Sequence, residues 1–171
     1  HNDFLFLYRQ TDNVKLNCFK LEAKFHLKQD TERDHRDALR LWTHGKSQPK
    51  DCDTLFSMMK KRGLITKEVR LRRIDNALEK RQLQLARWLA KPLDQSAKQH
   101  VNAWAQAHRH PEKFLTKQAE KFPKWTDMAA SRPARKNPDR LLKLIKDRKI
   151  PETVRQQAIL GAARTMAINL D

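Results

Sequence analysis

Residues 31–56 read TERDHRDALRLWTHGKSQPKDCDTLF and predict two short helices joined by a tight turn. Thr31 and Asp34 have the spacing of a capping box, in which each side chain bonds the backbone amide of the other residue. We expect the first helix to end at Gly45 and the second at Gly63, each glycine taking the left-handed backbone of a helix C-terminus. This segment is therefore interpreted as a helix hairpin.

Helical spacing continues on the C-terminal side of this hairpin. Further helix starts are predicted where a capping side chain or a first-turn proline precedes a periodic apolar pattern. These starts are Thr66, Asp94, Pro111, Asn137–Pro138 and Pro151–Glu152. The last helix is expected to run from Val154 to Leu170. One side of it carries small residues that let a neighbouring helix approach closely, namely Ala158, Gly161, Ala162 and Thr165.

Two segments depart from this pattern. Phe4–Tyr8 is apolar and too short for its period to distinguish a helix from a strand. Residues 131–138, with the sequence SRPARKNP, contain two prolines and three cations but no large apolar side chain. We expect this second segment to form an exposed loop.

The resulting chain has about eight to ten short helices with short connections, and no convincing alternating strand. Such a chain either closes into a bundle or stacks helix hairpins into a solenoid. Because the helices are uniformly short, the predicted fold class is all-α, a superhelix (α-solenoid) of stacked short helix hairpins.

Composition excludes several functions. The chain has 171 residues, of which only three are glycine, and it lacks both G-x-G-x-x-G and G-x-x-x-x-G-K-[ST], which argues against a nucleotide-driven enzyme. No apolar run approaches the roughly 18 residues of a membrane span. The formal charge of +17 predicts a polyanionic partner, such as nucleic acid, an anionic membrane or an acidic polymer.

Candidate contacts to such a partner lie in three cationic runs. Because the charge is spread over nearly every predicted helix, the pattern favours diffuse attraction to a polymer over the reading of bases, so nucleic acid is the less favoured partner. The plainer interpretation of these cations is a solvated helix surface. The nine candidates are Lys60, Lys61, Arg62, Arg70, Arg72, Arg73, Arg132, Arg135 and Lys136.

The sequence contains no recognisable arrangement of catalytic side chains. Cys18 and Cys52 form either a disulfide, which implies an oxidising compartment, or two unrelated buried thiols, and the residues alone leave both possibilities open. The histidines, among them His100 and His108, are interpreted as surface or packing residues. The glutamates mostly lie beside Lys or Arg, and no Ser-His-Asp or Cys-His arrangement is evident. No catalytic residue, metal ligand or cofactor is predicted.

The block L-W-x-x-G-K-S-Q-P-x-x-C-D-x-L-F, formed by Leu41–Phe56, resembles the soluble lytic murein transglycosylases of Gram-negative bacteria. The segment R-x-R-R-I-x-x-A-L from Arg70 to Leu78 continues the resemblance. So does the region from Thr153 to Ala163, which looks like the family's T-x-x-x-Q-x-A pattern. The resemblance is strong over residues 4–93 and thinner from there to Asp171.

This resemblance implies that residues 1–171 form part of one superhelical, U-shaped α-domain. In that family, the α-domain contributes to a ring on which a lysozyme-like domain cleaves the MurNAc–GlcNAc bond and leaves 1,6-anhydromuramic products. The family's catalytic E-S and G-L-M-Q-L-M-P-like motifs do not occur here, so the resemblance assigns no catalytic residue. It does imply a disulfide between Cys18 and Cys52, a periplasmic location, and peptidoglycan and the remainder of a parent chain as partners.

The sequence begins at His1 and runs directly into an apolar segment, so we expect a fragment or a processed chain. The leading hypothesis is a non-catalytic superhelical segment of a periplasmic lytic transglycosylase that shapes the ring and holds anionic peptidoglycan strands. The alternative is a basic helical-repeat scaffold that binds nucleic acid or a protein partner.

Overall fold

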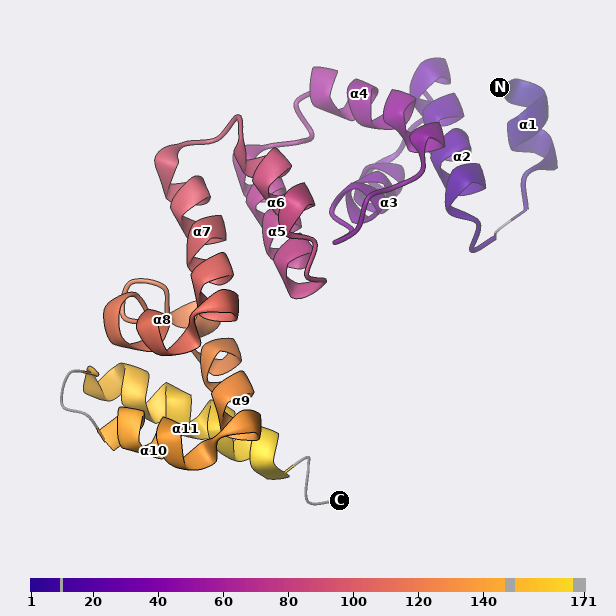
Figure 1. The fold of residues 1–171 in the computed structure, drawn as a ribbon. Helices are drawn as coiled ribbons and strands as arrows, with labels where there is room; N and C mark the ends of the chain where they lie inside the picture. The colour runs from indigo at the N-terminus through magenta and orange to yellow at the C-terminus, as the bar shows by residue number, and fades with distance from the viewer. Residues whose placement is uncertain (10, 147–149, 168–171) are drawn as a thin grey trace. The chain divides into compact units, whose positions relative to one another are not determined.

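The computed structural model describes residues 1–9, 11–146 and 150–167. Over these residues the chain consists of helices and connecting turns, without a strand. It divides into two compact units, His1–Asp94 and Gln95–Asp171 (Figure 1). The predicted all-α class is confirmed.

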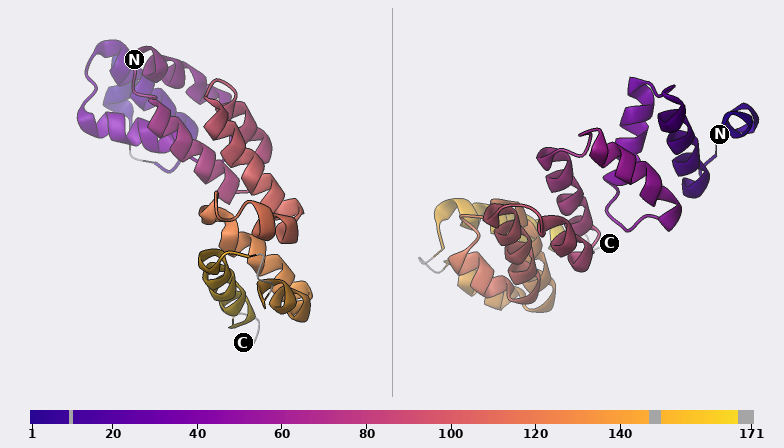
Figure 2. Two further views of the ribbon diagram at one scale, coloured as in Figure 1. Left: turned by 90° about the vertical axis from the view of Figure 1, so that its left-hand side faces the viewer. Right: turned by 90° about the horizontal axis from the view of Figure 1, so that it is seen from above.

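In the part of the first unit that the structure describes, there are six α-helices and one short 3-10 helix. Figure 1 shows α5 beside α6, and Figure 2 shows the same hairpin from two further directions. Helix α2 packs against both α3 and α4. The elements are α1 (Asn2–Leu7), α2 (Val14–Leu27), α3 (Glu32–Trp42), η1 (Lys50–Cys52), α4 (Asp53–Lys61), α5 (Lys67–Glu79) and α6 (Leu83–Ala90).

Side-chain caps start the helices where the sequence predicts them. The hydroxyl of Thr31 accepts a hydrogen bond from the amide of Asp34 at 3.3 Å, and the Asp34 carboxylate accepts one from the amide of Thr31 at 3.0 Å. The hydroxyl of Thr66 likewise accepts from the amide of Val69 at 3.3 Å. Both predicted caps are confirmed, and α3 and α5 begin directly after them.

The expectation of a left-handed Gly45 is wrong. Helix α3 already ends at Trp42, with Thr43 as its C-cap, and Gly63 is the one described glycine with a positive φ, of 73°. Gly45 is instead buried against α5, where a Cβ atom would lie 2.2 Å from the carbonyl oxygen of Asn76. Glycine is needed here for close approach of two backbones rather than for a left-handed turn.

Two helices of the first unit are followed by a non-glycine residue in the left-handed conformation. Lys28, the C-cap of α2, has a φ of 56°, and Arg81, which follows the C-cap of α5, has a φ of 58°. Non-glycine residues adopt this conformation at a modest free-energy cost of roughly 1–2 kcal/mol. The scarcity of glycine therefore does not prevent tight helix connections.

Over its described residues, the second unit contains five α-helices and a short 3-10 helix. Its predicted starts at Pro111, Pro138 and Glu152 are confirmed, and the helix predicted over 154–170 is observed as Glu152–Ala167, with residues 168–170 outside the described range. The elements are α7 (Gln95–Arg109), α8 (Pro111–Lys117), η2 (Pro123–Trp125), α9 (Thr126–Lys136), α10 (Pro138–Lys146) and α11 (Glu152–Ala167).

Helices α9 and α11 pack closely through small residues. Ala158, Gly161 and Ala162 of α11 are buried, and a Cβ atom at Gly161 would lie 3.0 Å from the Cα atom of Asp127 in α9. Ala130 of α9 is buried as well. The predicted close approach along the small side of the last helix is therefore confirmed.

The exposed loop predicted over residues 131–138 is wrong. Residues 131–136 continue α9, with Pro133 inside the helix, and Pro138 begins α10. An interior proline removes one backbone hydrogen bond and costs about 3 kcal/mol. Burial of Ala130 and Ala134 on either side of Pro133 offsets part of this cost.

The ambiguous segment Phe4–Tyr8 is helical over most of its length, because α1 extends from Asn2 to Leu7. Phe4 lies edge-on to Phe19 of α2, with the ring centroids 4.6 Å apart. This aromatic contact ties α1 to the rest of its unit.

The tryptophans divide into two classes. Trp42, Trp104 and Trp125 are almost fully buried, whereas Trp88 on α6 is 63% exposed. Ala86, Leu89 and Ala90 form the buried face of α6, and Trp88 lies off that face. None of the helices in the described residues has both the length and the apolar character needed to cross a membrane.

Candidate functional site

The cations at the end of α4 differ in their environments. Lys60 and Lys61 are exposed in its last turn. Arg62 instead donates hydrogen bonds to the carboxylate of Asp30 at 2.8 Å and to the carbonyl oxygen of Phe25 at 2.6 Å. Its guanidinium also lies 4.5 Å from the centre of the Phe25 ring. Arg62 thus has a structural role, and the two lysines are the cations free to meet a partner.

The environments of the three candidate arginines on α5 also differ, these being Arg70, Arg72 and Arg73. Arg72 is exposed, and Arg70 is half-buried with its guanidinium 5.7 Å from the centre of the Trp42 ring. Arg73 is only 5% exposed. Three arginines within four residues therefore occupy three different environments, and one of them is internal.

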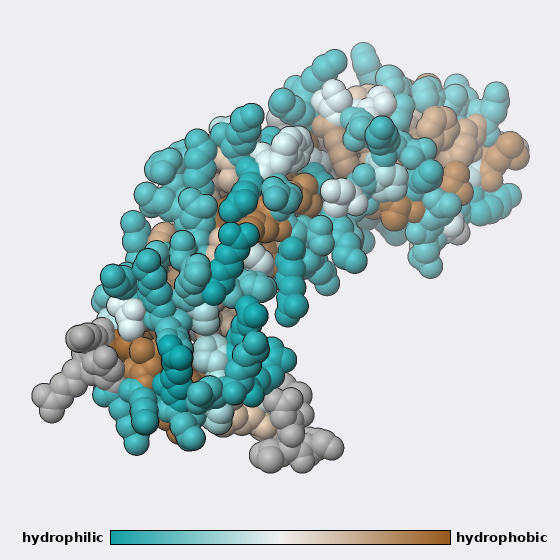
Figure 3. Space-filling view, viewed as in Figure 1, coloured by the Kyte–Doolittle hydropathy of each residue, from teal (hydrophilic) through white to brown (hydrophobic). Residues whose placement is uncertain are grey.

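The third run lies on α9 of the second unit. Arg132 donates to the carbonyl oxygen of His108 at 3.2 Å, while Arg135 and Lys136 are exposed in the last turn of the helix. Hydrophilic side chains cover much of the face seen in Figure 3, over helices of both units. The nine candidate cations are thus distributed over several helices, not gathered on one of them.

Arg73 lies at a groove of about 520 Å³ within the first unit. The groove is formed by the turn after α3, the start of α4, the middle of α5, and α6 with the residue before it. Its volume lies within the range of about 300–1,000 Å³ that is typical of small-molecule sites. Its lining residues are Ser47, Gln48, Asp53, Phe56, Arg73, Gln82, Gln84, Leu85 and Trp88.

The close contact at Gly45 holds one wall of this groove in place. Gly45 lies against the backbone of Asn76, and the Asn76 side-chain amide donates to the carbonyl oxygen of Thr43 at 2.7 Å. The turn is therefore fixed to α5 immediately before Ser47 and Gln48, which line the groove.

The guanidinium of Arg73 is held by aromatic rings. It lies 4.7 Å from the centre of the Trp42 ring and 5.9 Å from that of Phe56, distances typical of cation–π contacts. Its Nε atom is buried without a hydrogen-bond partner, and no carboxylate of the described residues forms an ion pair with it. Burial, together with the positive charge of Arg70, lowers the pKa of Arg73 to about 10. Arg73 is still protonated at neutral pH.

A second cavity, of about 460 Å³, is lined by Tyr8, Thr11 and Asp12, which precede α2, and by residues of α2 and α3. Two of its charged side chains are already paired with each other, because Lys24 donates to both carboxylate oxygens of Asp34, at 2.8 and 2.9 Å. Burial acts to raise the pKa of Asp34, but the hydrogen bonds from Lys24 and Thr31 outweigh it and lower that pKa. The cavity thus contains a satisfied ion pair, unlike the groove at Arg73.

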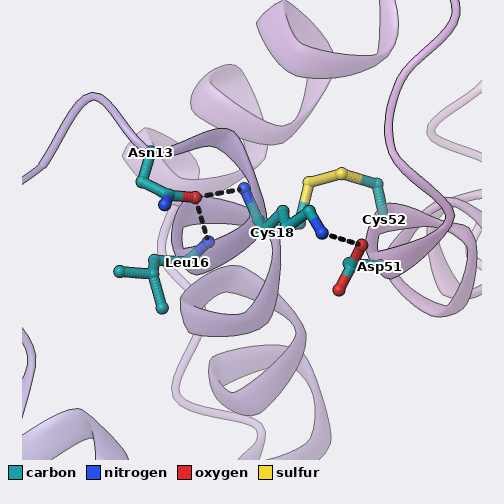
Figure 4. The surroundings of a disulfide bond; sticks show 6 residues. Asn13, Leu16, Cys18, Asp51 and Cys52 are labelled. Atoms are coloured by element: carbon teal, nitrogen blue, oxygen red, sulfur yellow. Dashed lines mark hydrogen bonds and ion pairs between the residues drawn. A yellow bond between two sulfur atoms is a disulfide. The ribbon is translucent and has the colours of Figure 1, made fainter.

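Cys18 of α2 and Cys52 at the end of η1 form a disulfide (Figure 4). Their Cα atoms are 5.1 Å apart, and 34 residues separate them in sequence. Beside this bridge, Lys15 and Asp51 form an exposed ion pair at 3.5 Å, which contributes little to stability. The structure therefore favours the disulfide over two unrelated thiols.

The described histidines that the sequence singled out pack against aromatic rings. The ring of His100 lies 5.1 Å from that of Trp125, and the ring of His108 lies 5.2 Å from that of Trp104. Over the part of the chain that the structure describes, no three His, Cys, Asp or Glu side chains are placed to hold a metal ion together. The ring contacts agree with the interpretation of His100 and His108 as surface or packing residues.

Sequence reasoning missed the groove. It named Arg73 as one cation among nine and assigned no role to Trp88. One feature could have indicated the groove. Trp88 lies off the buried face of α6, which is formed by Ala86, Leu89 and Ala90, so a large aromatic side chain is left on an otherwise polar surface. The turn residues Ser47 and Gln48, which had supplied part of the family resemblance, are brought to the same groove.

Comparison with known proteins identifies the fold. Neither a protein-family model nor a curated protein sequence matches the chain. One solved structure, the 70-kDa soluble lytic transglycosylase in complex with bulgecin A, superimposes with a TM-score of 0.64 at 20% sequence identity. The match covers 96% of this chain but only 28% of the transglycosylase chain. The chain shares the all-α fold of that part of the transglycosylase.

Proposed function

We propose that this chain is a non-catalytic superhelical segment of a periplasmic lytic murein transglycosylase. In this role, residues 1–171 belong to one U-shaped α-domain that helps to shape a ring and holds anionic peptidoglycan strands. A lysozyme-like domain elsewhere in the parent chain would cleave the MurNAc–GlcNAc bond. The main support is the fold shared with a soluble lytic transglycosylase over 96% of the chain.

The charge of the chain supports a polyanionic partner. Its formal net charge is +17, and several of the predicted cations are exposed on helices of both units. The lactyl and peptide carboxylates of peptidoglycan are spaced along a polymer, so a distributed cationic surface attracts them without a single deep site. Such attraction weakens as salt screens the charges.

The disulfide supports an oxidising compartment. Bridges of this kind persist in the periplasm and are rare in the cytosol. A cytosolic nucleic-acid scaffold, the alternative function, would be expected to contain two reduced thiols instead. A thiol assay on protein isolated from its native cells, before any oxidation in air, discriminates between these two compartments.

Co-sedimentation with purified murein tests the proposed function. The chain is expected to pellet with murein at about 0.01 M NaCl and to remain in solution at about 1 M, because the Debye length falls from about 30 Å to about 3 Å. Chitin, a neutral polymer of N-acetylglucosamine, is the matched control and should pellet much less of the chain.

Three results would contradict the proposal. One is the absence of murein binding at low salt, and another is binding to murein that does not change with salt. The third is a strong preference for duplex DNA over murein in a direct competition at the same ionic strength, which would favour the nucleic-acid scaffold.

A further inference from the structure

We propose that the groove lined by Arg73 and Trp88 binds a saccharide that carries a carboxylate group. The guanidinium of Arg73 would bind the carboxylate, and the indole of Trp88 would cover one face of the sugar ring. This inference rests on the proposed function, because it adds one specific subsite to a surface otherwise expected to act through diffuse charge.

The first argument is the unbalanced charge of Arg73. A buried cation is costly unless it is paired or hydrogen-bonded. The rings of Trp42 and Phe56 stabilise the guanidinium, but its buried Nε lacks a partner and no carboxylate of the described residues neutralises it. In the other cavity of this unit, Lys24 already has Asp34 as its partner. Arg73 thus lines the groove as a charged donor that still requires an anion.

The aromatic contacts also fix where an anion would bind. A guanidinium in contact with the rings of both Trp42 and Phe56 loses much of the rotational freedom of an arginine side chain. Arginine is well suited to carboxylates because its planar fork donates two parallel hydrogen bonds. A preorganised guanidinium therefore loses less entropy on binding than the exposed Arg72 or Lys60 would.

The second argument is the exposure of Trp88. A tryptophan that is 63% exposed leaves a large apolar face in water, and this one lines a groove that also contains Arg73. An aromatic ring with nearby polar side chains suits a ligand that has one apolar face and a rim of hydroxyl groups. A sugar ring has both features.

The third argument is the rest of the groove lining, most of which is polar and uncharged. Gln48 and Gln84 each offer an amide donor and acceptor, and Ser47 offers a hydroxyl. Asp53 is an exposed acceptor suited to sugar hydroxyls. Among the described lining residues, Arg73 is the one cation, and Asp53 forms no ion pair with it. A single cation disfavours a polyphosphate backbone, because such a ligand requires several cations.

Ligand-observed NMR titration tests the inference on the whole chain. N-acetylmuramic acid, which combines a sugar ring with a carboxylate, is the probe. N-acetylglucosamine lacks the carboxylate and lactate lacks the ring, so each should bind at least about tenfold more weakly. Among the indole N–H signals of the four tryptophans, the signal assigned by its loss in Trp88→Phe should shift on binding.

Variants identify the contribution of each side chain. Trp88→Ala should weaken binding of N-acetylmuramic acid about tenfold or more without unfolding the chain, because Trp88 is mostly exposed. Arg73→Met, of similar length, should remove the preference for N-acetylmuramic acid over N-acetylglucosamine. Arg87→Gln is the matched control, since it removes an exposed charge next to Trp88 from a residue outside the groove lining and should leave binding unchanged.

Several outcomes would overturn the inference. Equal binding of N-acetylglucosamine rejects the role of the carboxylate, equal binding of lactate rejects a saccharide site, and undiminished binding by Trp88→Ala rejects the groove. If Arg73→Met fails to fold, Trp88→Ala and Gln48→Ala still decide the question. Salt-dependent murein binding without monosaccharide binding rejects this inference alone, whereas monosaccharide binding without murein binding rejects the proposed function.

Discussion

Gly45 is the residue at which two backbones of the first unit come closest. A Cβ atom there would lie 2.2 Å from the Asn76 carbonyl oxygen and 2.7 Å from the Asn76 carbonyl carbon. Both atoms belong to the backbone of α5, so they cannot rotate away as a flexible side chain would. The turn that carries Ser47 and Gln48 would have to separate from the helix.

Gly45→Ala is therefore expected to lower the free energy of unfolding of the first unit by about 2–3 kcal/mol, as overpacked cores do. Gly63→Ala is the matched control, because Gly63 has open space around its Cα and its φ of 73° penalises alanine by only about 1 kcal/mol. Urea denaturation of both variants measures the difference. Equal losses of stability would contradict the close-approach explanation.

Residue environments on α5 illustrate a limit of sequence reasoning. Arg72 and Arg73 are adjacent and chemically identical, yet the first is exposed and the second is 5% exposed. The helical period places them 100° apart, but an arginine beside the apolar stripe is ordinarily assigned to the surface. The burial of Arg73 depends on Trp42 and Phe56, which belong to two other helices and whose rings lie beside its guanidinium. The sequence of α5 alone does not contain this information.

At the scale of elements, the N-terminus of α3 is joined to α2 by charge as well as by packing. Asp34 caps α3 through Thr31 and accepts two hydrogen bonds from Lys24 of α2. Burial alone would raise the pKa of Asp34, but these bonds outweigh it, so the pKa of Asp34 in the folded state lies below the usual value of an aspartate. The ionised carboxylate consequently stabilises the folded state above the unfolded pKa, and this contribution is lost as the pH falls through the folded pKa.

Stability of the first unit should therefore decrease as the pH falls below about 4. Asp34→Asn is expected to lower the free energy of unfolding at neutral pH by about 1–3 kcal/mol and to flatten its dependence on pH below 4. Glu32→Gln, on the same helix turn but with a side chain that is 94% exposed, should change neither. Urea titrations across this pH range test both statements, and an equally steep acid loss in Asp34→Asn would contradict them.

Helix starts were easier to predict from the sequence than helix interruptions. Thr31, Thr66 and Pro111 act through local hydrogen bonds or backbone restrictions, so their neighbours in sequence suffice. The sequence around Pro133 is typical of a loop, yet Pro133 lies inside α9. Residues 131–136 are helical because α9 packs against α11, which is distant in sequence.

At the scale of the whole molecule, the disulfide lies within one of the two compact units. Cys18 and Cys52 both belong to His1–Asp94. The chain-entropy model gives such a bridge about 3–4 kcal/mol of stabilisation, by restricting the unfolded state. The second unit contains no cysteine and gains nothing from the bridge.

Replacing both cysteines, by Cys18→Ser and Cys52→Ser together, should lower the melting temperature of the first unit by at least about 10 °C. The transition of the second unit should remain where it is. Differential scanning calorimetry of the oxidised chain and of the double variant resolves the two transitions, and the reduced parent chain is a second control. Parallel shifts of both transitions would show that the units unfold as one.

The all-α class and the pairing of Cys18 with Cys52 were predictable from the sequence for different reasons. Fold class follows from apolar periods repeated along the whole chain, whereas the pairing came from resemblance and not from the residues themselves. The groove could not be predicted, because its lining comes from four segments between residues 47 and 88 whose side chains have no common local pattern.

The uneven burial of the tryptophans gives this chain an optical property. Trp42, Trp104 and Trp125 are shielded from solvent, while Trp88 is not. Collisional quenchers dissolved in water therefore reach essentially one emitter, and it lines the groove. The unlabelled protein thus has an intrinsic fluorophore at its candidate binding site, so occupation of the groove would be registered as a loss of quenching by acrylamide.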